Sequence, residues 1–387
     1  MQVAYRVDAA PHIGSGHLMR CLTLADTLKL RGCEAHFLGR PGSGAARALV
    51  QARQHRWHDV CAAIEPGFEP GAPPHAAWLG TSQTADATAA AAILAALRPD
   101  WLVIDHYALD ERWERHARPL VGRILVIDDL ADRRHDCDLL LDQNYHTQPE
   151  RRYEGRVPGH TRCLLGPRHA LLRPEFAAAR ARRRRRDGSI QRLLISLGGA
   201  DTCDVTTLAL DAALQLLPSG SIDVVVGSDY AARQALAERC AAHDHVHLHV
   251  QTDRMSELMA AADLAIGAAG SSTWERLCLG LPAINLAIAD NQIPGLTSLC
   301  AGGLTIGTTD VRTLTAEGLG AMLKTLQLAP TFTAGMGERG AALVDGQGSR
   351  RVADAMLPPP VALRSASQTD CEDTYAWRND PSVRAHS

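Results

Sequence analysis

Short apolar runs alternate with longer segments of helical periodicity along most of the chain. An apolar run bounded by turn residues is typical of a strand buried in a parallel sheet, and its alternation with helices is typical of βαβ units. In the first half, the pattern predicts an alanine-rich helix over 84–97 and strands at 3–7, 35–38, 101–105, 123–127 and 138–142. In the second half, it predicts strands at 192–199, 222–226, 245–250, 264–267, 283–286 and 304–306. We therefore predict an α/β fold of two doubly wound domains in tandem, with a cleft between their facing strand ends.

The length of the chain agrees with two domains. Its 387 residues exceed one ordinary domain and leave a remainder beyond two. We place an N-terminal Rossmann-like domain at 1–155, an interdomain connection at 156–188 and a C-terminal Rossmann-like domain at 189–356. A linker and a polar tail follow at 357–387.

The connection ends in a run of arginines at 182–186. One interpretation is a basic patch for nucleic acid, and the other is the solvated end of a helix that leads into the linker. No aromatic residues are interleaved with the arginines, and the net charge of the chain is −3. The sequence therefore favours the solvated helix end and predicts no nucleic-acid partner.

The cysteine content of the chain indicates its cellular compartment and whether a metal site is expected. The ten cysteines are scattered, without a Cys-x-x-Cys pair or a Cys/His cluster at zinc-ligand spacing. This is typical of free thiols in a reduced protein, so we predict a cytoplasmic location and neither a metal nor another cofactor. No signal-peptide pattern begins the chain, and no apolar run reaches the roughly 20 residues that a membrane helix needs, so we predict no membrane insertion.

The most distinctive motif follows the first strand and reads Gly14-x-Gly16-His17. Apolar residues then recur at helical spacing, at Leu18, Leu22, Ala25 and Leu28. His17 thus stands where a glycine loop becomes a helix. The free amides and positive dipole at that end disfavour protonation of a histidine, which suits a general base. The alternative is a surface histidine that merely begins a helix.

The same loop resembles a dinucleotide fingerprint only in part. The third glycine of that fingerprint would fall at Met19, and the second strand runs into Gly39-Arg40 without the expected acidic residue. A dehydrogenase is therefore poorly supported.

A second motif, Gly270-Ser271-Ser272 with Glu275, follows the strand at 264–267. A turn of small residues lets a ligand approach the backbone, and the amides at a helix start attract a diphosphate. Glu275 could accept hydrogen bonds from both hydroxyls of a ribose. Alternatively, Ser272-x-x-Glu275 is a capping box that only stabilises the helix start.

Two further turns follow strands of the second half. Gly198-Gly199-x-Asp201 could close over phosphates or be an ordinary βα turn, and Asp290-Asn291-Gln292 could contact a ligand or cap a helix. In the first half, Tyr107 follows the strand at 101–105 and could hold a sugar, assist proton transfer, or simply be a half-buried ring at a strand end. Arg173 precedes Pro174, which suits the first position of a helix, and could contact an anionic substrate or be a surface arginine.

Taken together, these motifs resemble the UDP-2,4-diacetamido-2,4,6-trideoxy-β-L-altropyranose hydrolases of pseudaminic acid biosynthesis. The resemblance covers roughly residues 2–355 and rests on Arg6-x-Asp8, Ile13-Gly14-x-Gly16-His17-x-x-Arg20, Ile104-Asp105-His106-Tyr107, Leu171-Leu172-Arg173-x-Glu175-Phe176, Gly198-Gly199-x-Asp201 and Asn291-Gln292. It implies a glycosyltransferase-B (GT-B) fold, with the sugar held mainly by the first domain and UDP by the second.

The resemblance also assigns roles to residues. It implies that His17 is the base that activates water, with Tyr107 as its catalytic partner. Substrate contacts would come from Gly14, Gly16, Arg173 and Asn291. Contacts to UDP would come from Gly199, Gly270, Ser271, Ser272 and Glu275. The expected ligand is a small UDP-sugar, and other enzymes of the same pathway are possible partners.

The implied reaction is hydrolysis with inversion. Water attacks the anomeric carbon from the face opposite UDP, His17 removes its proton, and helix-end amides neutralise the departing diphosphate without a metal. Two other interpretations stay open: a GT-B glycosyltransferase with a UDP-N-acetylhexosamine-type donor, and a non-catalytic binding module. The tail, with Asp370-Cys371 and Trp377-Arg378-Asn379, resembles the start of a GNAT N-acetyltransferase, and as a fragment it is expected to transfer no acetyl group.

Overall fold

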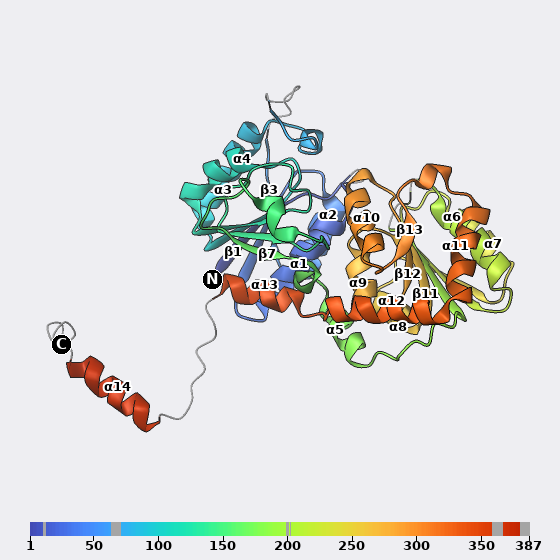
Figure 1. Ribbon diagram of the computed structural model, residues 1–387. Helices are drawn as coiled ribbons and strands as arrows, with labels where there is room; N and C mark the ends of the chain where they lie inside the picture. The colour runs from blue at the N-terminus through green and yellow to red at the C-terminus, as the bar shows by residue number, and fades with distance from the viewer. Residues whose placement is uncertain (11–12, 63–70, 199–200, 202, 358–366, 380–387) are drawn as a thin grey trace. The chain divides into compact units, whose positions relative to one another are not determined.

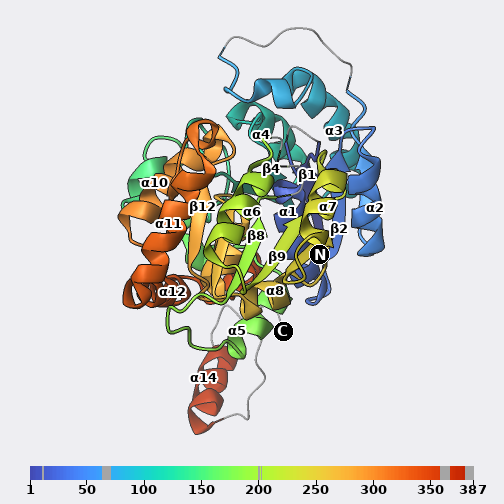
Figure 2. The same cartoon turned by 90° about the vertical axis from the view of Figure 1, so that its right-hand side faces the viewer.

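The computed structural model describes residues 1–10, 13–62, 71–198, 201, 203–357 and 367–379. It divides into a large unit, Met1–Ala353, and a small one, Asp354–Ser387. The large unit contains two parallel sheets with helices packed against them (Figures 1 and 2). The described part of the small unit contains the last residues of α13 (Gly348–Met356) and the helix α14 (Gln368–Asn379). The strand that the acetyltransferase resemblance implies at 361–367 lies almost wholly outside the described residues.

The first sheet has seven parallel strands in the order β3-β2-β1-β4-β5-β6-β7. Its strands are β1 (Gln2–Val7), β2 (Glu34–Gly39), β3 (Arg56–Asp59), β4 (Trp101–Asp105), β5 (Arg123–Ile127), β6 (Leu139–Asp142) and β7 (Arg162–Leu165). Its helices are α1 (Gly16–Lys29), α2 (Gly44–Ala52), α3 (Gln83–Leu97) and α4 (Glu111–Ala117), with short 3₁₀ turns η1 (Ala76–Trp78), η2 (Arg118–Leu120), η3 (Pro149–Tyr153) and η4 (Pro167–His169).

The second sheet has six parallel strands in the order β10-β9-β8-β11-β12-β13. Helix α5 (Pro174–Ala181) precedes it, with Pro174 in the first turn as predicted. The strands are β8 (Arg192–Ser196), β9 (Ser221–Val226), β10 (Val246–Val250), β11 (Leu264–Ala268), β12 (Ala283–Leu286) and β13 (Ile306–Thr308). The helices are α6 (Val205–Leu216), α7 (Arg233–Ala241), α8 (Met255–Ala261), α9 (Ser272–Cys278), α10 (Ile293–Ala301), α11 (Ala316–Leu328) and α12 (Pro330–Leu343), with 3₁₀ turns η5 (Asp290–Gln292) and η6 (Val311–Thr313). The chain then continues into α13 (Gly348–Met356), whose Ser349 and Arg351 donate to the carbonyls of Leu172 and Arg168.

The burial of each strand explains whether the apolar pattern of the sequence predicted it. Every residue of β4 and β11 is buried, because helices cover both faces of a parallel sheet, and such strands read as continuous apolar runs. The two strands that the pattern did not predict, β3 and β7, lie at the edges of the first sheet and are only partly buried. Their four-residue sequences include Arg56, Asp59 and Arg162, which interrupt any apolar run.

The strand order of each sheet reverses once. In the first sheet the reversal lies between β1 and β4, where Val7 pairs with Asp105, and in the second it lies between β8 and β11. Loops diverge at such a point, and ligands of open α/β sheets bind outside the carboxyl ends of the strands there. The loop before His17 leaves β1, and the turn before Glu275 leaves β11.

The arginine run at 182–186 is largely structural. Arg186 is 7% exposed and donates hydrogen bonds to five backbone carbonyls, of Met259, Ala260, Ala262, Leu279 and Gly280. Its neighbours form ion pairs, Arg183 with Glu338 and Arg184 with Asp263. The prediction of a solvated helix end is therefore wrong for Arg186, which instead joins the carboxyl ends of α8 and α9.

We expect Arg186→Met to lower the free energy of unfolding by about 3 kcal/mol or more, because the five carbonyls lose the charged donor that they share. Burial lowers the pKa of Arg186 only to about 10, so the charged donor is present at neutral pH. Chemical and thermal unfolding would measure the change. Arg185→Met, at the exposed neighbouring position, is the control and should alter stability by less than about 0.5 kcal/mol. Equal stability of the two variants would contradict this stabilising role of the Arg186 hydrogen bonds.

In the described ranges, no helix combines the length and the apolar character that crossing a membrane requires.

Candidate active site

His17 is held at the start of α1 by the loop that follows β1. Gly14 has a φ of +79°, a conformation that favours glycine, and its amide donates to the carbonyl of Ala10 over 2.8 Å. The helix begins at Gly16, so His17 is its second residue. Its exposed fraction is 8%, so the alternative of a surface histidine is wrong.

Asp105 fixes the orientation of the His17 ring. It ends β4, is buried, and its Oδ1 lies 2.6 Å from His17 Nδ1. Burial alone would raise the pKa of Asp105, but Arg20 and His17 outweigh it and hold that pKa well below its usual range. An ionised carboxylate only accepts hydrogen bonds, so Nδ1 carries the proton. Nε2 has no hydrogen-bond partner within the described part of the chain, and in the neutral ring its lone pair is free.

Tyr107 lies beside this pair. Its ring packs edge-on against that of His17, with centroids 4.6 Å apart, and its hydroxyl donates to Oδ2 of Asp129 over 2.8 Å. Burial and the charge of Asp129 raise the pKa of Tyr107 well above its usual value. Tyr107 therefore stays protonated and acts through hydrogen bonds and packing.

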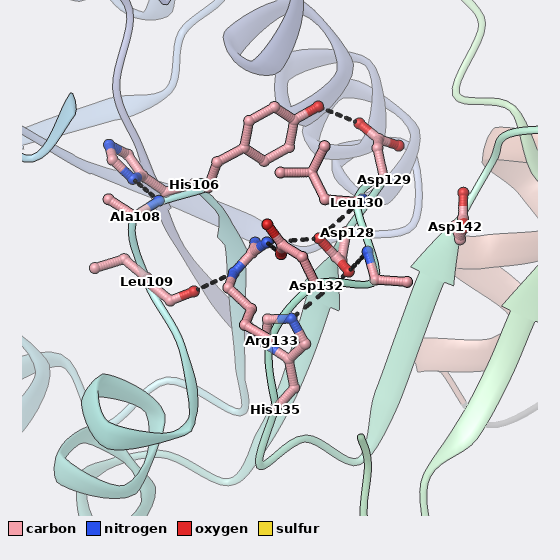
Figure 3. A network of polar contacts seen from close by, with 12 residues as sticks. His106, Ala108, Leu109, Asp128, Asp129, Leu130, Asp132, Arg133, His135 and Asp142 are labelled. Carbon is pink, nitrogen blue, oxygen red and sulfur yellow. Dashed lines mark hydrogen bonds and ion pairs between the residues drawn. The ribbon is translucent and has the colours of Figure 1, made fainter. Parts of the chain in front are cut away.

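The loop after β5 carries Asp129 and is rigidly built. Asp128 accepts hydrogen bonds from the amides of Leu130 and Ala131 and pairs with Arg133 over 3.0 Å, an arrangement that Figure 3 shows beside Asp129 and Asp142. The guanidinium of Arg133 also lies 5.8 Å from the centre of the Tyr107 ring. The contacts of Asp128 and Arg133 thus fix the loop and the position of Asp129 within it.

His75 and Trp78, at the 3₁₀ turn η1, extend the aromatic cluster. Trp78 stacks on Tyr107 with centroids 5.4 Å apart and lies 6.2 Å from His17, while His75 packs on Trp78 at 4.7 Å. Both rings are half-buried. Sequence reasoning missed them, because no motif marks this segment and its distance from His17 along the chain hides the contact.

His106 belongs to a separate, internal network. It is 3% exposed, and its Nε2 lies 3.2 Å from Asp8, which Arg6 holds together with Asp86. Burial lowers the pKa of His106. This network ties the end of β1 to α3.

In α9, Glu275 does not form the capping box that the sequence offered as the alternative to a ligand contact. The N-cap of α9 is Ser271, which makes no side-chain capping bond, and Ser272 Oγ accepts from Arg276 instead. Oε1 of Glu275 pairs with Arg173 over 3.3 Å. Burial raises the pKa of Glu275, and Arg173 counteracts that rise.

The remaining predicted residues are distributed as follows. A Cβ placed on Gly16 would lie 3.6 Å from Ser271 Oγ, so the loop before His17 faces the turn before α9. Gly270 borders Gln292, whose Nε2 would lie 3.5 Å from an added Cβ. Asn291 is exposed in η5. The N-cap of α10 is Gln292, which belongs to the segment 290–292 predicted as a cap or a ligand contact, although its side chain makes no capping bond.

The glycine turn after β8 is described in part. Gly199 lies outside the described residues. Asp201 accepts hydrogen bonds from the amides of Val205 and Thr206 at the start of α6, as an ordinary βα turn requires. In the described ranges, no group of three or more His, Cys, Asp or Glu side chains is placed to hold a metal ion.

Several curated proteins are similar in sequence. An uncharacterized protein of Methanocaldococcus jannaschii is 24% identical over 293 residues, which are 74% of this chain and 55% of that protein. The spore coat polysaccharide biosynthesis protein SpsG of Bacillus subtilis is 28% identical over 202 residues, 51% of this chain and 58% of that protein. The UDP-2,4-diacetamido-2,4,6-trideoxy-β-L-altropyranose hydrolase of Campylobacter jejuni is 28% identical over 205 residues, 52% and 71% of the two chains. The chain thus spans little more than half the length of the first two relatives. It matches no protein-family model.

Solved structures show the fold. MurG of Acinetobacter baumannii superposes with a TM-score of 0.65 and 16% identity, over 92% of this chain and 99% of that one. The calicheamicin glycosyltransferase CalG4 superposes with a TM-score of 0.60 and 15% identity, over 93% and 99%. The chain therefore has the GT-B fold, with two Rossmann-like α/β domains, as predicted.

Proposed function

We propose that this chain is an enzyme that hydrolyses a UDP-sugar, with His17 as the base that activates water. The observation that carries the proposal is the His17–Asp105 pair: a buried carboxylate 2.6 Å from Nδ1 fixes the proton there and leaves Nε2 as the acceptor. The substrate we favour is UDP-2,4-diacetamido-2,4,6-trideoxy-β-L-altropyranose, on the motifs described above and the printed name of the Campylobacter jejuni relative. The protein would then act with the other enzymes of pseudaminic acid biosynthesis.

The proposed step is a single displacement at the anomeric carbon. The oxygen of a water molecule forms a bond to that carbon while the bond to the UDP oxygen breaks, and its electron pair leaves with UDP. One proton of the water moves to Nε2 of His17. Attack opposite the leaving group inverts the anomeric configuration, and the products are UDP and the free hexose.

The proposal divides binding between the two sheets. Gly14, Gly16, Tyr107, Arg173 and Asn291 would contact the sugar side of the ligand. The turn of Gly270, Ser271 and Ser272, with Gly199 and Glu275, would contact UDP. The approach of Gly16 to Ser271 supports this division, because it brings the loop of the base next to the proposed diphosphate turn.

A GT-B glycosyltransferase is the second candidate. The solved structures of similar fold include glycosyltransferases, one of them a Streptomyces enzyme complexed with thymidine diphosphate (TM-score 0.57). The same base would then remove a proton from an acceptor hydroxyl instead of from water.

The compartment we propose is the cytoplasm, because all ten cysteines are free thiols.

Incubation with the UDP-diacetamido hexose in ¹⁸O-labelled water, without an acceptor, tests the proposal. Mass spectrometry should find the label on the released sugar. Label on UDP would move the attack to phosphorus and overturn the mechanism. UDP release only after addition of an acceptor would favour the glycosyltransferase, and UDP binding without any turnover would favour a binding module.

Glu275 gives a pH-dependent prediction for UDP binding. An ionised Glu275 accepts from both ribose hydroxyls, so UDP affinity should rise as pH increases through the raised pKa of Glu275. In Arg173→Met the counteracting charge is lost, the pKa rises further, and the rise in affinity should move to higher pH. Titration calorimetry with UDP would measure it. The control ligand is 2′-deoxy-UDP, which lacks one of the hydroxyls and should show a weaker pH dependence; identical curves for both ligands would contradict the ribose contact.

A further inference from the structure

Arg20 bridges the two carboxylates that hold the candidate catalytic side chains. Its Nε and Nη2 donate to the two oxygens of Asp105 over 2.6 and 2.7 Å, and its Nη1 donates to Oδ2 of Asp129 over 2.6 Å. Asp105 in turn binds His17 and Asp129 binds Tyr107. Arg20 is 6% exposed, and it follows His17 by three residues, so both lie on one face of α1.

We propose that Arg20 is a positioning residue that holds His17 and Tyr107 in one fixed arrangement through Asp105 and Asp129. The inference rests on the proposed function for its kinetic readout but not for its structural one. Arg20 does not touch the reacting atoms. It acts through the two carboxylates and through its Nη2, which lies 3.3 Å from His17 Nδ1.

The geometry requires arginine in particular. A guanidinium is planar and presents several N–H groups in a rigid fork, so it can grip both oxygens of Asp105 and still reach Asp129. A lysine offers a single point charge and can neutralise one carboxylate without fixing its plane. The plane of Asp105 decides where Oδ1 lies, and Oδ1 decides the orientation of the His17 ring.

Other titratable groups face this cluster. Cys21 Sγ lies 3.5 Å from Asp105 Oδ2, and His75 packs beside Tyr107 at 5.4 Å. On the side of Asp129, Arg152 donates to its backbone carbonyl over 2.8 Å and to Asp142 over 3.1 Å. Burial and the charge of Asp129 raise the pKa of Asp142 to about 7, and His146 Nε2 lies 3.9 Å from Asp142. Within the cluster and these neighbours, Arg20 is the cation that contacts both Asp105 and Asp129.

Removing the charge of Arg20 should change the pKa of Asp105 in a defined direction. Besides burial, which raises it, the largest influence on the pKa of Asp105 is Arg20, which lowers it. In Arg20→Met this pKa must rise, and a protonated Asp105 no longer accepts from His17 Nδ1. The acid limb of the kcat/KM profile should therefore move to higher pH, while Arg20→Lys should move it less.

The main test is a double-mutant cycle. Arg20→Lys should lower kcat on the order of 10- to 100-fold, because a small displacement of the base is costly, with KM and UDP affinity changed by less than about threefold. In the His17→Ala background the same substitution should have almost no further effect. An equal loss in both backgrounds would overturn the proposal, because it would mean that Arg20 acts only through general stability.

Arg118→Lys is the matched control. Arg118 also bridges two carboxylates, those of Asp136 at 3.2 Å and Asp138 at 2.5 Å. Neither of these carboxylates holds His17 or Tyr107. Its substitution should leave kcat within about twofold. If Arg20→Lys fails to fold, Asp129→Asn replaces it, since this variant retains the Arg20–Asp105 contact. Its loss of activity should vanish in the Tyr107→Phe background, and an additive loss would overturn the proposal.

A spectroscopic measurement on the unliganded protein separates this proposal from the proposed function. In ¹⁵N-histidine NMR, the His17 signal, assigned by its loss in His17→Ala, should report the Nδ1–H tautomer in the wild type and a mixture in Arg20→Lys. An unchanged tautomer in Arg20→Lys would overturn the positioning role. Absence of turnover in the wild type would instead overturn the proposed hydrolysis and leave the NMR result in place.

Discussion

Replacing His17 with alanine is expected to slow UDP release on the order of 10²- to 10⁴-fold, the range in which a general base contributes to catalysis. In the proposed mechanism the free Nε2 of His17 is the acceptor for the proton of water, and alanine leaves none. UDP affinity should stay nearly unchanged, because the proposed UDP contacts lie on the second sheet. Single-turnover release of UDP, with UDP binding measured by calorimetry, separates the two effects.

The control for this variant is another histidine of the first domain. The side chain of His160 is 62% exposed, and its Nε2 lies 4.0 Å from Asp138 Oδ1. His160→Ala should retain full activity. Activity of His17→Ala within about twofold of the wild type would remove His17 from the mechanism.

Replacing Asp105 with asparagine is expected to produce a comparable loss, on the order of 10²- to 10⁴-fold, although His17 is still present. The asparagine amide can donate to Nδ1, which places the imidazole proton on Nε2 and blocks the base. The double variant with His17→Ala should be no slower than His17→Ala alone, because the two residues act as one unit.

Folding must be measured beside activity for this variant. Asp105 is fully buried against Arg20, and removal of one member of a buried ion pair destabilises a protein by about 3–5 kcal/mol. Rates should therefore be normalised to the fraction of protein that binds UDP. Asp132→Asn, at a partly exposed carboxylate that pairs with Arg133, serves as the control. Full activity in Asp105→Asn would show that the tautomer of His17 does not limit the reaction.

The sequence by itself determined the core of both sheets and the place of the main motifs. The central strands read as unbroken apolar runs because both of their faces are covered, and the glycines before His17 marked the transition from strand to helix. The edge strands β3 and β7 escaped prediction for the converse reason: their partial exposure admits charged residues. Arg186 escaped because a run of arginines carries no sign that one of them is buried among carbonyl groups.

Only the tertiary structure decided how the candidate site is assembled. Asp105 is 88 residues from His17 and Asp129 is 109 from Arg20, and their contacts depend on β4 pairing with β1 rather than with the strand before it in the chain. The local pattern of a strand does not encode its neighbour in a parallel sheet, because each crossover is long enough to skip strands. The same holds for Glu275, whose spacing from Ser272 predicted a capping box as readily as a ligand contact. Its pairing with Arg173 followed from packing at a distance of 102 residues, which no local spacing can express.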